Sequence, residues 1–303
     1  MVIGMDLLQL RYFCKIARLE HITRAAEELH VSQPALSKTL KLLEQELGTE
    51  LFDRTGKFIR LNNYGRVFLK YAEQSLEALE NGKRELADMS SGQAGDIRLA
   101  FPVGSHVVPA LLSRFRQQYP DITFTLIQHF GPSDPPRFDL CISSLPLQIP
   151  RVESLPLLTE ELFLAVPADH KLAGRTSIRL EDASEEHFVT LRTGNDLRER
   201  TDSLCRIAGF NPKRIFESDD PATVRGLIRA GLGIALVPAV SWDGSVGEHV
   251  RLIRIEQPVC ERTIGISWLE DHYLSKACLI FREFTVAYFH ELALANAPGD
   301  SSV

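Results

Sequence analysis

Hydrophobic positions recur at helical spacing in three consecutive segments near the start of the chain. The first lies in residues 6–20, where Leu7, Leu10, Cys14 and Ala17 form an apolar stripe, and the second covers Thr23–Leu29. The third follows Ser32, which is a good N-cap, and stops at Gly48. Its apolar side consists of leucines spaced at helical intervals, namely Leu36, Leu40, Leu43 and Leu47. The pattern therefore predicts three short helices in succession.

The other face of the third predicted helix is small, polar and basic. At ~100° per residue, the side chains that point away from the leucines are those of Pro34, Ser37, Lys38, Lys41 and Gln45. Such a face suits a groove lined by phosphates. A solvated lysine face is the alternative interpretation.

A basic hairpin is predicted directly after these helices. Leu51–Leu61 reads as two short strand-like pieces around Gly56, and Arg54, Lys57 and Arg60 lie on it. A basic hairpin behind a helix-turn-helix is typical of a wing that reaches a neighbouring minor groove.

A long helix is predicted from Asn63 to about Met89, with Asn62 as its cap. At 1.5 Å per residue it would span roughly 40 Å. Its apolar positions form a seam of alternating three- and four-residue steps, made of Leu69, Ala72, Leu76, Leu79 and Leu86. The seam favours pairing with a second copy of the chain, and packing against its own domain is the alternative.

The stretch Ser90–Gly95 has the composition of a hinge, and strands alternate with helices beyond it. The strands expected are Ile97–Phe101, Thr123–Gln128, Asp139–Ser143, Leu162–Val166, Phe188–Leu191, Arg214–Glu217, Gly233–Val237, Arg251–Ile255 and Arg262–Trp268. The helices expected are Val107–Gln118, Asp196–Ala208, Pro221–Ala230 and His272–Ala295. The alternation predicts an α/β fold with mostly parallel sheets in two lobes. The last strand and the final helix are expected to return to the first lobe.

Composition and charge narrow the classes of protein. The chain is 44% hydrophobic and 24% charged, as is ordinary for a globular protein. The chain contains no run of ~18 apolar residues, so no transmembrane helix is predicted. Its first residues lack a basic stretch followed by an apolar one, so no secretory signal is predicted. The net charge is −6, yet residues 1–90 hold 13 basic and 13 acidic residues, so only this part can face phosphate. Five cysteines without a C-x-x-C pair favour free thiols in a reducing cytoplasm over disulfides or zinc.

The segment Ile22–Lys41, ITRAAEELHVSQPALSKTLK, closely resembles the helix-turn-helix of LysR-type transcriptional regulators. The resemblance continues through Leu42–Arg54 and Leu61–Gly65, and it recurs more weakly at Gly95–Leu99, Leu111–Pro120 and Gly231–Pro238. It implies a winged helix-turn-helix of all-α type in residues 1–62 and a dimerising linker helix in residues 63–90. It further implies a two-lobed α/β effector domain, like that of periplasmic binding proteins, in residues 91–303.

The chain departs from the family pattern after the second expected strand. The family has a helix there, but Gly131–Phe138 contains three prolines in eight residues and cannot be helical. Part of the usual wall of the effector cleft is therefore expected to be shortened.

The expected DNA contacts combine the residue chemistry with the resemblance. The amide of Gln33 can pair bidentately with adenine, and Ser37 can bond either base edge. Lysines and a helix-start threonine suit phosphates, and a wing arginine suits a narrow minor groove. The expected DNA-binding residues are Thr23, Ser32, Gln33, Pro34, Ser37, Lys38, Lys41, Arg54 and Arg60.

A ligand site is expected between the lobes. Pro102–His106 joins a strand end to a helix start, where free N–H groups and the helix dipole favour an anion. A second edge, Thr190–Asn195, offers polar groups from the opposite lobe. The expected effector-binding residues are Gly104, Ser105, His106, Arg192, Thr193 and Asn195. Ordinary helix capping by Ser105 and Asn195 is the alternative.

No catalytic or metal-binding pattern stands out, since the nine histidines are scattered and no GxSxG, P-loop or HExxH occurs. Cys205 could be a redox sensor beside Arg206, but a small core residue is favoured. The expected function is a cytoplasmic regulator without enzymatic activity, cofactor or membrane association. Its expected partners are double-stranded promoter DNA, a small-molecule effector for which an anion is expected, its own copies as a dimer or tetramer, and RNA polymerase. A two-lobed solute-binding protein or enzyme with an oligomerisation module is the alternative. RNA binding is disfavoured, because the N-terminal region lacks aromatic platforms.

Overall fold

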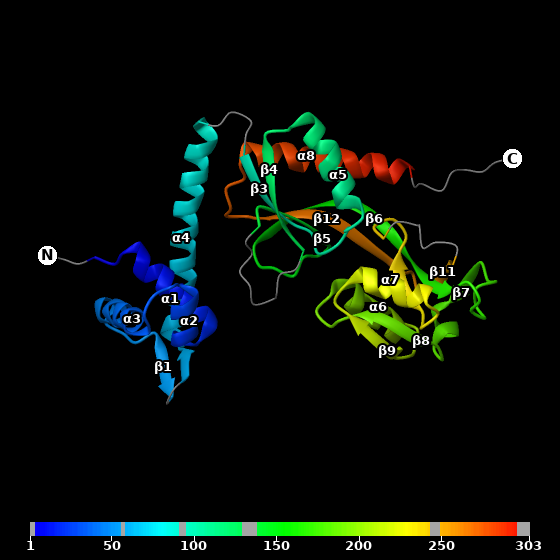
Figure 1. The fold of residues 1–303 in the computed structure, drawn as a ribbon, viewed down its shortest axis with the longest axis horizontal. Helices are drawn as coiled ribbons and strands as arrows, with labels where there is room; N and C mark the ends of the chain where they lie inside the picture. Colours follow the sequence, from blue (N-terminus) through cyan, green and yellow to red (C-terminus); the bar gives the residue numbers. More distant parts are fainter. Residues whose placement is uncertain (1–3, 56–57, 91–94, 129–137, 243–248, 296–303) are drawn as a thin grey trace. The chain divides into compact units, whose positions relative to one another are not determined.

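The computed structural model describes residues 4–55, 58–90, 95–128, 138–242 and 249–295. It contains two compact units (Figure 1). One holds residues 4–90, and the other holds the described residues from 95 onward.

Three helices at the start of the chain pack around a small apolar core. They are α1 (Leu7–Leu19), α2 (Ile22–Glu28) and α3 (Gln33–Leu47). Ala25 and Ala26 of α2 are buried, because their small side chains let the neighbouring helices approach closely. The predicted leucine stripe of α3 lies in the same core, where Leu36 and Leu43 are both 0% exposed. Three helices are confirmed where the apolar spacing predicted them.

A hairpin and a long helix complete this unit. β1 (Phe52–Thr55) pairs antiparallel with β2 (Phe58–Leu61), as the wing prediction requires. The helix α4 runs from Asn63 to Ser90, one residue beyond the predicted end. The side chain of Asn62 accepts a hydrogen bond from the Gly65 amide at 2.9 Å, so it caps α4 as expected.

Strands and helices alternate in the second unit, as predicted. In chain order they are β3 (Gly95–Ala100), α5 (Val107–Gln118), β4 (Ile122–Ile127), β5 (Leu140–Ser144), β6 (Val152–Pro167), β7 (Ser177–Arg179), the 3₁₀ turn η1 (Leu180–Ala183), β8 (His187–Leu191), α6 (Asp196–Ile207), β9 (Lys213–Ser218), α7 (Pro221–Arg229), β10 (Ala235–Pro238), β11 (Val250–Gln257), β12 (Glu261–Leu269) and α8 (Lys276–Ala295). The prediction missed β7 and the first half of β6, and it started α8 four residues early, at His272.

The expectation of mostly parallel sheets is wrong, because the main sheet is mixed. Its order is β4-β3-β5-β12-β6-β11-β7, and β10 also pairs with β6. Within it the pairs β3–β4, β3–β5 and β7–β11 are parallel, whereas β10, β11 and β12 all run antiparallel to β6. β8 and β9 form a separate parallel pair. The physical reason is the length of β6. This 16-residue strand serves both lobes, so the strands that return along it run in the opposite direction.

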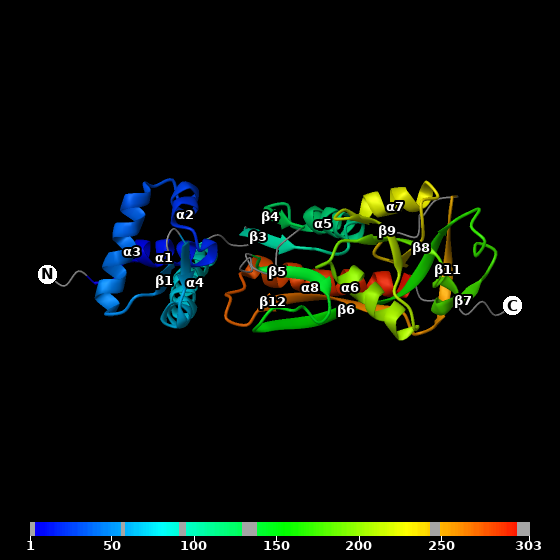
Figure 2. The same cartoon turned by 90° about the horizontal axis from the view of Figure 1, so that it is seen from below.

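Two separate apolar cores define the two lobes of this unit. The first core gathers side chains from β3, α5, β5, β12 and α8, and the second gathers side chains from the far half of β6 and from η1 through β11. Figures 1 and 2 both place α8 beside α5, which confirms that the chain returns to the first lobe. The proline-rich segment that replaces the family helix falls in residues 129–137, outside the described residues.

Candidate nucleic-acid interface and ligand cavity

The helix α3 has one buried and one exposed face. Gln33, Pro34, Lys38 and Lys41 are exposed opposite the leucine stripe, and Ser37 is partly exposed. The amide Nε2 of Gln33 donates to Oγ of Ser37 at 3.4 Å, so the two groups form one polar patch a single turn long. The predicted contact residues of this helix therefore lie together and are accessible to a partner.

The start of α3 is shaped by its cap and its proline. Oγ of Ser32 accepts a hydrogen bond from the Ala35 amide at 3.4 Å, and Pro34 lies in the first turn, where a missing N–H costs nothing. Thr23 is exposed at the second position of α2. Ser32 is thus an N-cap in this structure, and its backbone lies beside the accessible end of the helix.

Three expected phosphate-binding cations are exposed and uncommitted. Lys38, Lys41 and Arg60 form no ion pair with any residue in the described ranges. By contrast, Arg11 and Arg18 of α1 are engaged in ion pairs with α4. The side chain of Arg54, together with residues 56 and 57, lies outside the part of the wing that the structure describes.

Two glutamates anchor the wing to the helices, and the sequence reasoning missed both. Oε1 of Glu44, a buried side chain of α3, accepts the Leu51 amide at 2.9 Å at the entrance of the hairpin. Oε1 of Glu20 accepts the Leu61 amide at 2.9 Å at its exit. Because both ends of the hairpin are held, the wing and α3 keep a fixed mutual geometry within this unit.

The predicted seam of α4 divides into two halves. Ala72 is buried, and Leu69 and Leu76 pack against the core of the three helices. The second half differs, since Leu79 is 47% and Leu86 68% exposed. The alternative interpretation, in which the seam packs against the domain of its own chain, therefore holds for the first half of the seam only.

A cavity of about 250 Å³ opens between the two lobes of the second unit. One wall is the turn from β3 to α5, and the other is formed by the turn from β8 to α6, the start of α7 and Trp242. Helix starts thus dominate the lining. This size and mixture of apolar walls with a few polar groups suit a small metabolite.

The start of α5 has no side-chain cap, unlike the starts of α6 and α7. Gly104 has φ +77°, a left-handed conformation, and its carbonyl accepts the amides of Val107 and Val108 at 2.9 Å each. No side chain caps α5, and Ser105 donates and accepts no hydrogen bond among the described residues. Capping therefore does not account for Ser105, which lines the cavity with Gly104 and His106.

The opposite edge is divided between cavity and solvent. Asn195 lines the cavity, but Oδ1 also accepts the Leu197 amide at 3.0 Å, so the capping interpretation applies to it. Arg192 and Thr193 are exposed and are not among the described residues that line the cavity. The cavity also receives residues that sequence reasoning missed, chiefly Gln128, Asp219, Asp220, Arg225, Trp242 and Arg262.

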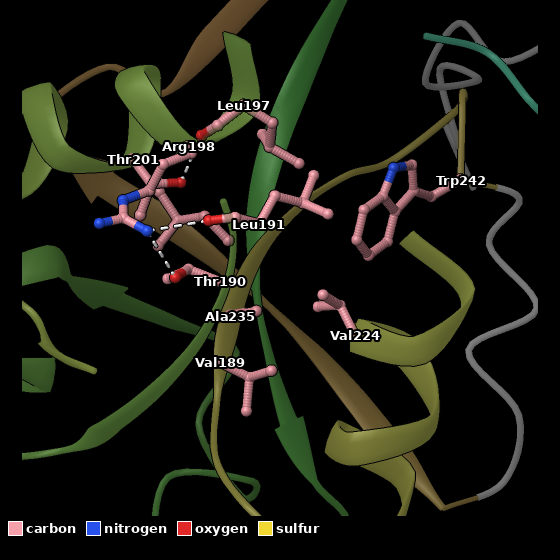
Figure 3. A pocket seen from close by; sticks show the side chains of 10 residues that line it. Val189, Thr190, Leu191, Leu197, Arg198, Thr201, Val224, Ala235 and Trp242 are labelled. Atoms are coloured by element: carbon pink, nitrogen blue, oxygen red, sulfur yellow. Dashed lines mark hydrogen bonds between the residues drawn. The ribbon is translucent and has the colours of Figure 1, made fainter. Parts of the chain in front are cut away.

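A buried arginine holds the second edge in place. Nη1 of Arg198 donates to Oγ1 of Thr190 at 3.1 Å and to the carbonyl of Leu191 at 2.9 Å (Figure 3). The same atom lies 2.6 Å from Oε1 of Glu217, and Nε pairs with Asp202 at 2.8 Å. In Figure 3 this guanidinium and Trp242 lie on opposite sides of Leu191 and Leu197. Arg198 thus joins β8, α6 and β9 behind the cavity wall.

Comparison with known proteins decides the family. A family model described as "Bacterial regulatory helix-turn-helix protein, lysR family" matches residues 7–66, and "LysR substrate binding domain" matches residues 90–289. The chain belongs to the LysR family. It is a DNA-binding transcriptional regulator with an effector-binding domain.

Individual relatives of this LysR chain agree in length and fold. The uncharacterised HTH-type transcriptional regulator YybE of Bacillus subtilis is 36% identical over 295 residues, which cover 95% of this chain and 100% of the relative. A full-length OxyR variant from Pseudomonas aeruginosa has a TM-score of 0.66 at 27% identity and covers 95% of each chain. The effector-binding domain of QuiR, solved in complex with shikimate, has a TM-score of 0.58 at 31% identity and covers 65% of this chain and 98% of that domain.

The family assignment confirms the resemblance, the winged helix-turn-helix joined to a two-lobed domain, and the regulatory function. The alternative of a solute-binding protein or enzyme with an oligomerisation module is set aside. No helix in the described ranges is long and apolar enough to cross a membrane.

The cysteines of this LysR chain are core residues in the structure. All five are buried, and burial raises the pKa of the Cys205 thiol to about 12. Burial likewise raises the pKa of Cys260 to about 11. Since the thiolate is the reactive form, the geometry supports the core interpretation of Cys205 over a redox sensor.

Proposed function

We propose that the chain recognises promoter DNA with the exposed face of α3 and the β1–β2 wing. Gln33 and Ser37 would read base edges in the major groove, and Ser32 and Pro34 would place the start of α3 against it. Thr23, Lys38 and Lys41 would hold phosphates, and Arg54 and Arg60 would reach the neighbouring minor groove. The single observation that carries this proposal is the uncommitted polar and basic face of α3 opposite its buried leucines.

The domain limits follow the same proposal. Residues 1–62 would bind DNA, residues 63–90 would link and pair copies of the chain, and residues 91–303 would bind the effector. The exposed second half of the α4 seam supports pairing as a homodimer, or as a homotetramer built from two such dimers. The regulator would act in the cytoplasm and would have no enzymatic activity. When bound at a promoter, it would contact RNA polymerase.

The cavity between the lobes would hold the effector. The uncapped start of α5 at Gly104, Ser105 and His106 supports a small anion, because N–H groups and the helix dipole favour negative charge there. Asn195 would close the site from the other lobe, with Arg192 and Thr193 at its outer rim. The complex of QuiR with shikimate, a small carboxylic acid, supports the same ligand class.

Selection of bound sequences from a random DNA library, followed by footprinting, tests the proposal. We expect one partly palindromic site, protection of a major groove by α3, and a footprint that changes with a small carboxylate. Each phosphate held by a lysine should add ~0.9 to the slope of log affinity against log salt. Binding without any sequence preference would contradict base reading by α3.

A further inference from the structure

The two long strands that connect the lobes, β6 and β12, are neighbours in the sheet and share one buried pair of opposite charges. Glu160 of β6 lies directly opposite Arg262 of β12 in the antiparallel register. On β6, the residues up to 161 pair with β12, whereas residues 162–165 pair with β10 in the second lobe. Glu160 and Arg262 therefore lie where the strand passes from one lobe to the other.

The carboxylate of Glu160 is fully engaged. Oε1 accepts from Nε of Arg262 at 2.8 Å and from Oγ of Ser241 at 2.7 Å. Oε2 accepts the amides of Val240 at 3.0 Å and Ser241 at 2.8 Å. The side chain of Glu160 is 0% exposed, so these four donors replace its water.

The guanidinium of Arg262 is held by two hydrogen bonds, and one of its nitrogens remains available as a donor. Its side chain is 3% exposed, Nε donates to Glu160, and Nη2 donates to Oγ of Ser241. Nη1 makes no hydrogen bond with any residue that the structure describes, and Arg262 is one of the residues lining the cavity. Two of its three nitrogens therefore fix the side chain, and the third remains as a donor for a ligand.

Other charged groups also line the cavity, namely Asp219, Asp220 and Arg225. The carboxylate of Asp220 caps α7 by accepting the amides of Ala222 and Thr223 at 3.0 Å each. Arg225 stacks on Trp242, 5.2 Å from the ring centroid. Asp219 is exposed at the rim. Arg262, whose side chain is 3% exposed, is therefore a buried cation in the lining of the cavity, on a strand that passes between the lobes.

We propose that Nη1 of Arg262 recognises the carboxylate of the effector, and that Glu160 and Ser241 hold the guanidinium in position for it. This inference rests on the proposed effector cavity and adds its specificity-determining residue. Glu160 offsets part of the charge of Arg262, so the site favours a planar acceptor that completes the hydrogen bonds over a bare point charge. A ligand bound to Arg262 would also lie where β6 and β12 pass from one lobe to the other.

The test uses the full-length chain and four probes: shikimate, its neutral methyl ester, acetate and inorganic phosphate. We expect calorimetry to show shikimate binding at least about tenfold more tightly than the ester, the difference expected for one charge-assisted hydrogen bond. The double variant Arg262→Met with Glu160→Leu removes the pair without leaving a buried charge, and it should abolish this preference. Arg262→Lys keeps the charge but loses the planar fork, and it should weaken shikimate severalfold.

A second Arg–Glu pair, which includes the neighbour of Glu160 on β6, offers a control. Arg254 and Glu161 form an Arg–Glu pair at 2.8 Å that is more exposed than the Arg262–Glu160 pair, and neither residue is among the described residues that line the cavity. Arg254→Met with Glu161→Leu should keep the preference for shikimate over the ester. If the double variant fails to fold by circular dichroism, the Arg262→Lys result and the ¹⁵N shift of Nε of Arg262 on adding shikimate decide the matter.

Three results would overturn the assignment. They are equal binding of shikimate and its ester, an unchanged preference in the Arg262 variants, or no saturable binding of any of the three anions. A preference that disappears in Ser105→Ala but survives in the Arg262 variants would assign the anion to the start of α5 alone. In that case the proposed effector cavity stands and only the role of Arg262 fails.

Discussion

Gln33 and Ser37 lie one turn apart on the exposed face of α3, with Nε2 of Gln33 3.4 Å from Oγ of Ser37. In the absence of DNA, each side chain is thus the other's partner. A base edge in the major groove can replace this long and weak bond without leaving a buried group unsatisfied. The pair is therefore accessible and preoriented for reading bases.

Replacement of Gln33 by alanine should weaken binding to the selected DNA site by ~1–3 kcal/mol and relax the preference at one base pair. Binding to random DNA should change little, because Gln33 carries no charge. Fluorescence anisotropy with both DNAs measures the two effects. Gln45→Ala, which removes an exposed amide near the other end of α3, is the matched control. Equal losses on both DNAs would show that Gln33 does not read bases.

The divided seam of α4 predicts different results for two leucines. Leu86→Glu should lower the oligomeric state, because a charge would enter the exposed apolar half that is available to a second copy. Leu76→Glu should instead destabilise the three-helix core against which Leu76 packs. Light scattering reports the first effect and thermal unfolding the second. A Leu86→Glu variant with an unchanged oligomeric state would place the pairing surface elsewhere.

Ser105 is expected to contribute to effector binding and not to DNA binding. Ser105→Ala should weaken shikimate, or any other carboxylate that binds the cavity, by ~1.5–3 kcal/mol, as for a hydrogen bond to a charged group. Operator binding without effector should stay within about twofold, because the two sites lie in separate domains. Calorimetry and gel shifts measure the two. Ser113→Ala, on the same helix but away from the cavity, is the control.

Asp139 predicts a pH dependence of the stability of the first lobe. Burial opposes ionisation of this carboxyl, but hydrogen bonds from His272 at 2.9 Å and from Arg98 at 2.7 Å outweigh it and hold the pKa of Asp139 well below its usual range. A lowered pKa in the folded state stabilises the protein above the unfolded pKa of ~3.9, and this contribution is lost as the pH falls.

Asp139→Asn should therefore cost about 2 kcal/mol near neutral pH and progressively less below pH ~4. Urea unfolding at several pH values measures the difference between the two proteins. Asp96→Asn, at an exposed position of β3, serves as the control. A cost that does not shrink with falling pH would mean that the asparagine disturbs packing and that the ion pair contributes little.

Local pattern alone determined much of this protein. The spacing of leucines placed α3, Ser32 and Pro34 marked its start, and Gly48 marked its end, because caps and apolar periodicity act over a few residues. The face that remains exposed followed from the same periodicity. Every element of the DNA-binding unit was therefore predictable without tertiary information. The sequence also indicated the turn at Ser105 as a candidate ligand edge, but only the structure showed that Ser105 does not cap α5.

Tertiary structure alone decided the rest. The apolar seam of α4 reads as uniform along the chain, yet Leu76 is covered by the three-helix core and Leu86 is exposed, because the core ends partway along the helix. Nothing local distinguishes Glu160 and Arg262 from other charged strand residues, and they are 102 positions apart. They meet because one long strand serves both lobes and a later strand returns along it. Burial then compels the two charges to pair, since neither can be left without water or a partner.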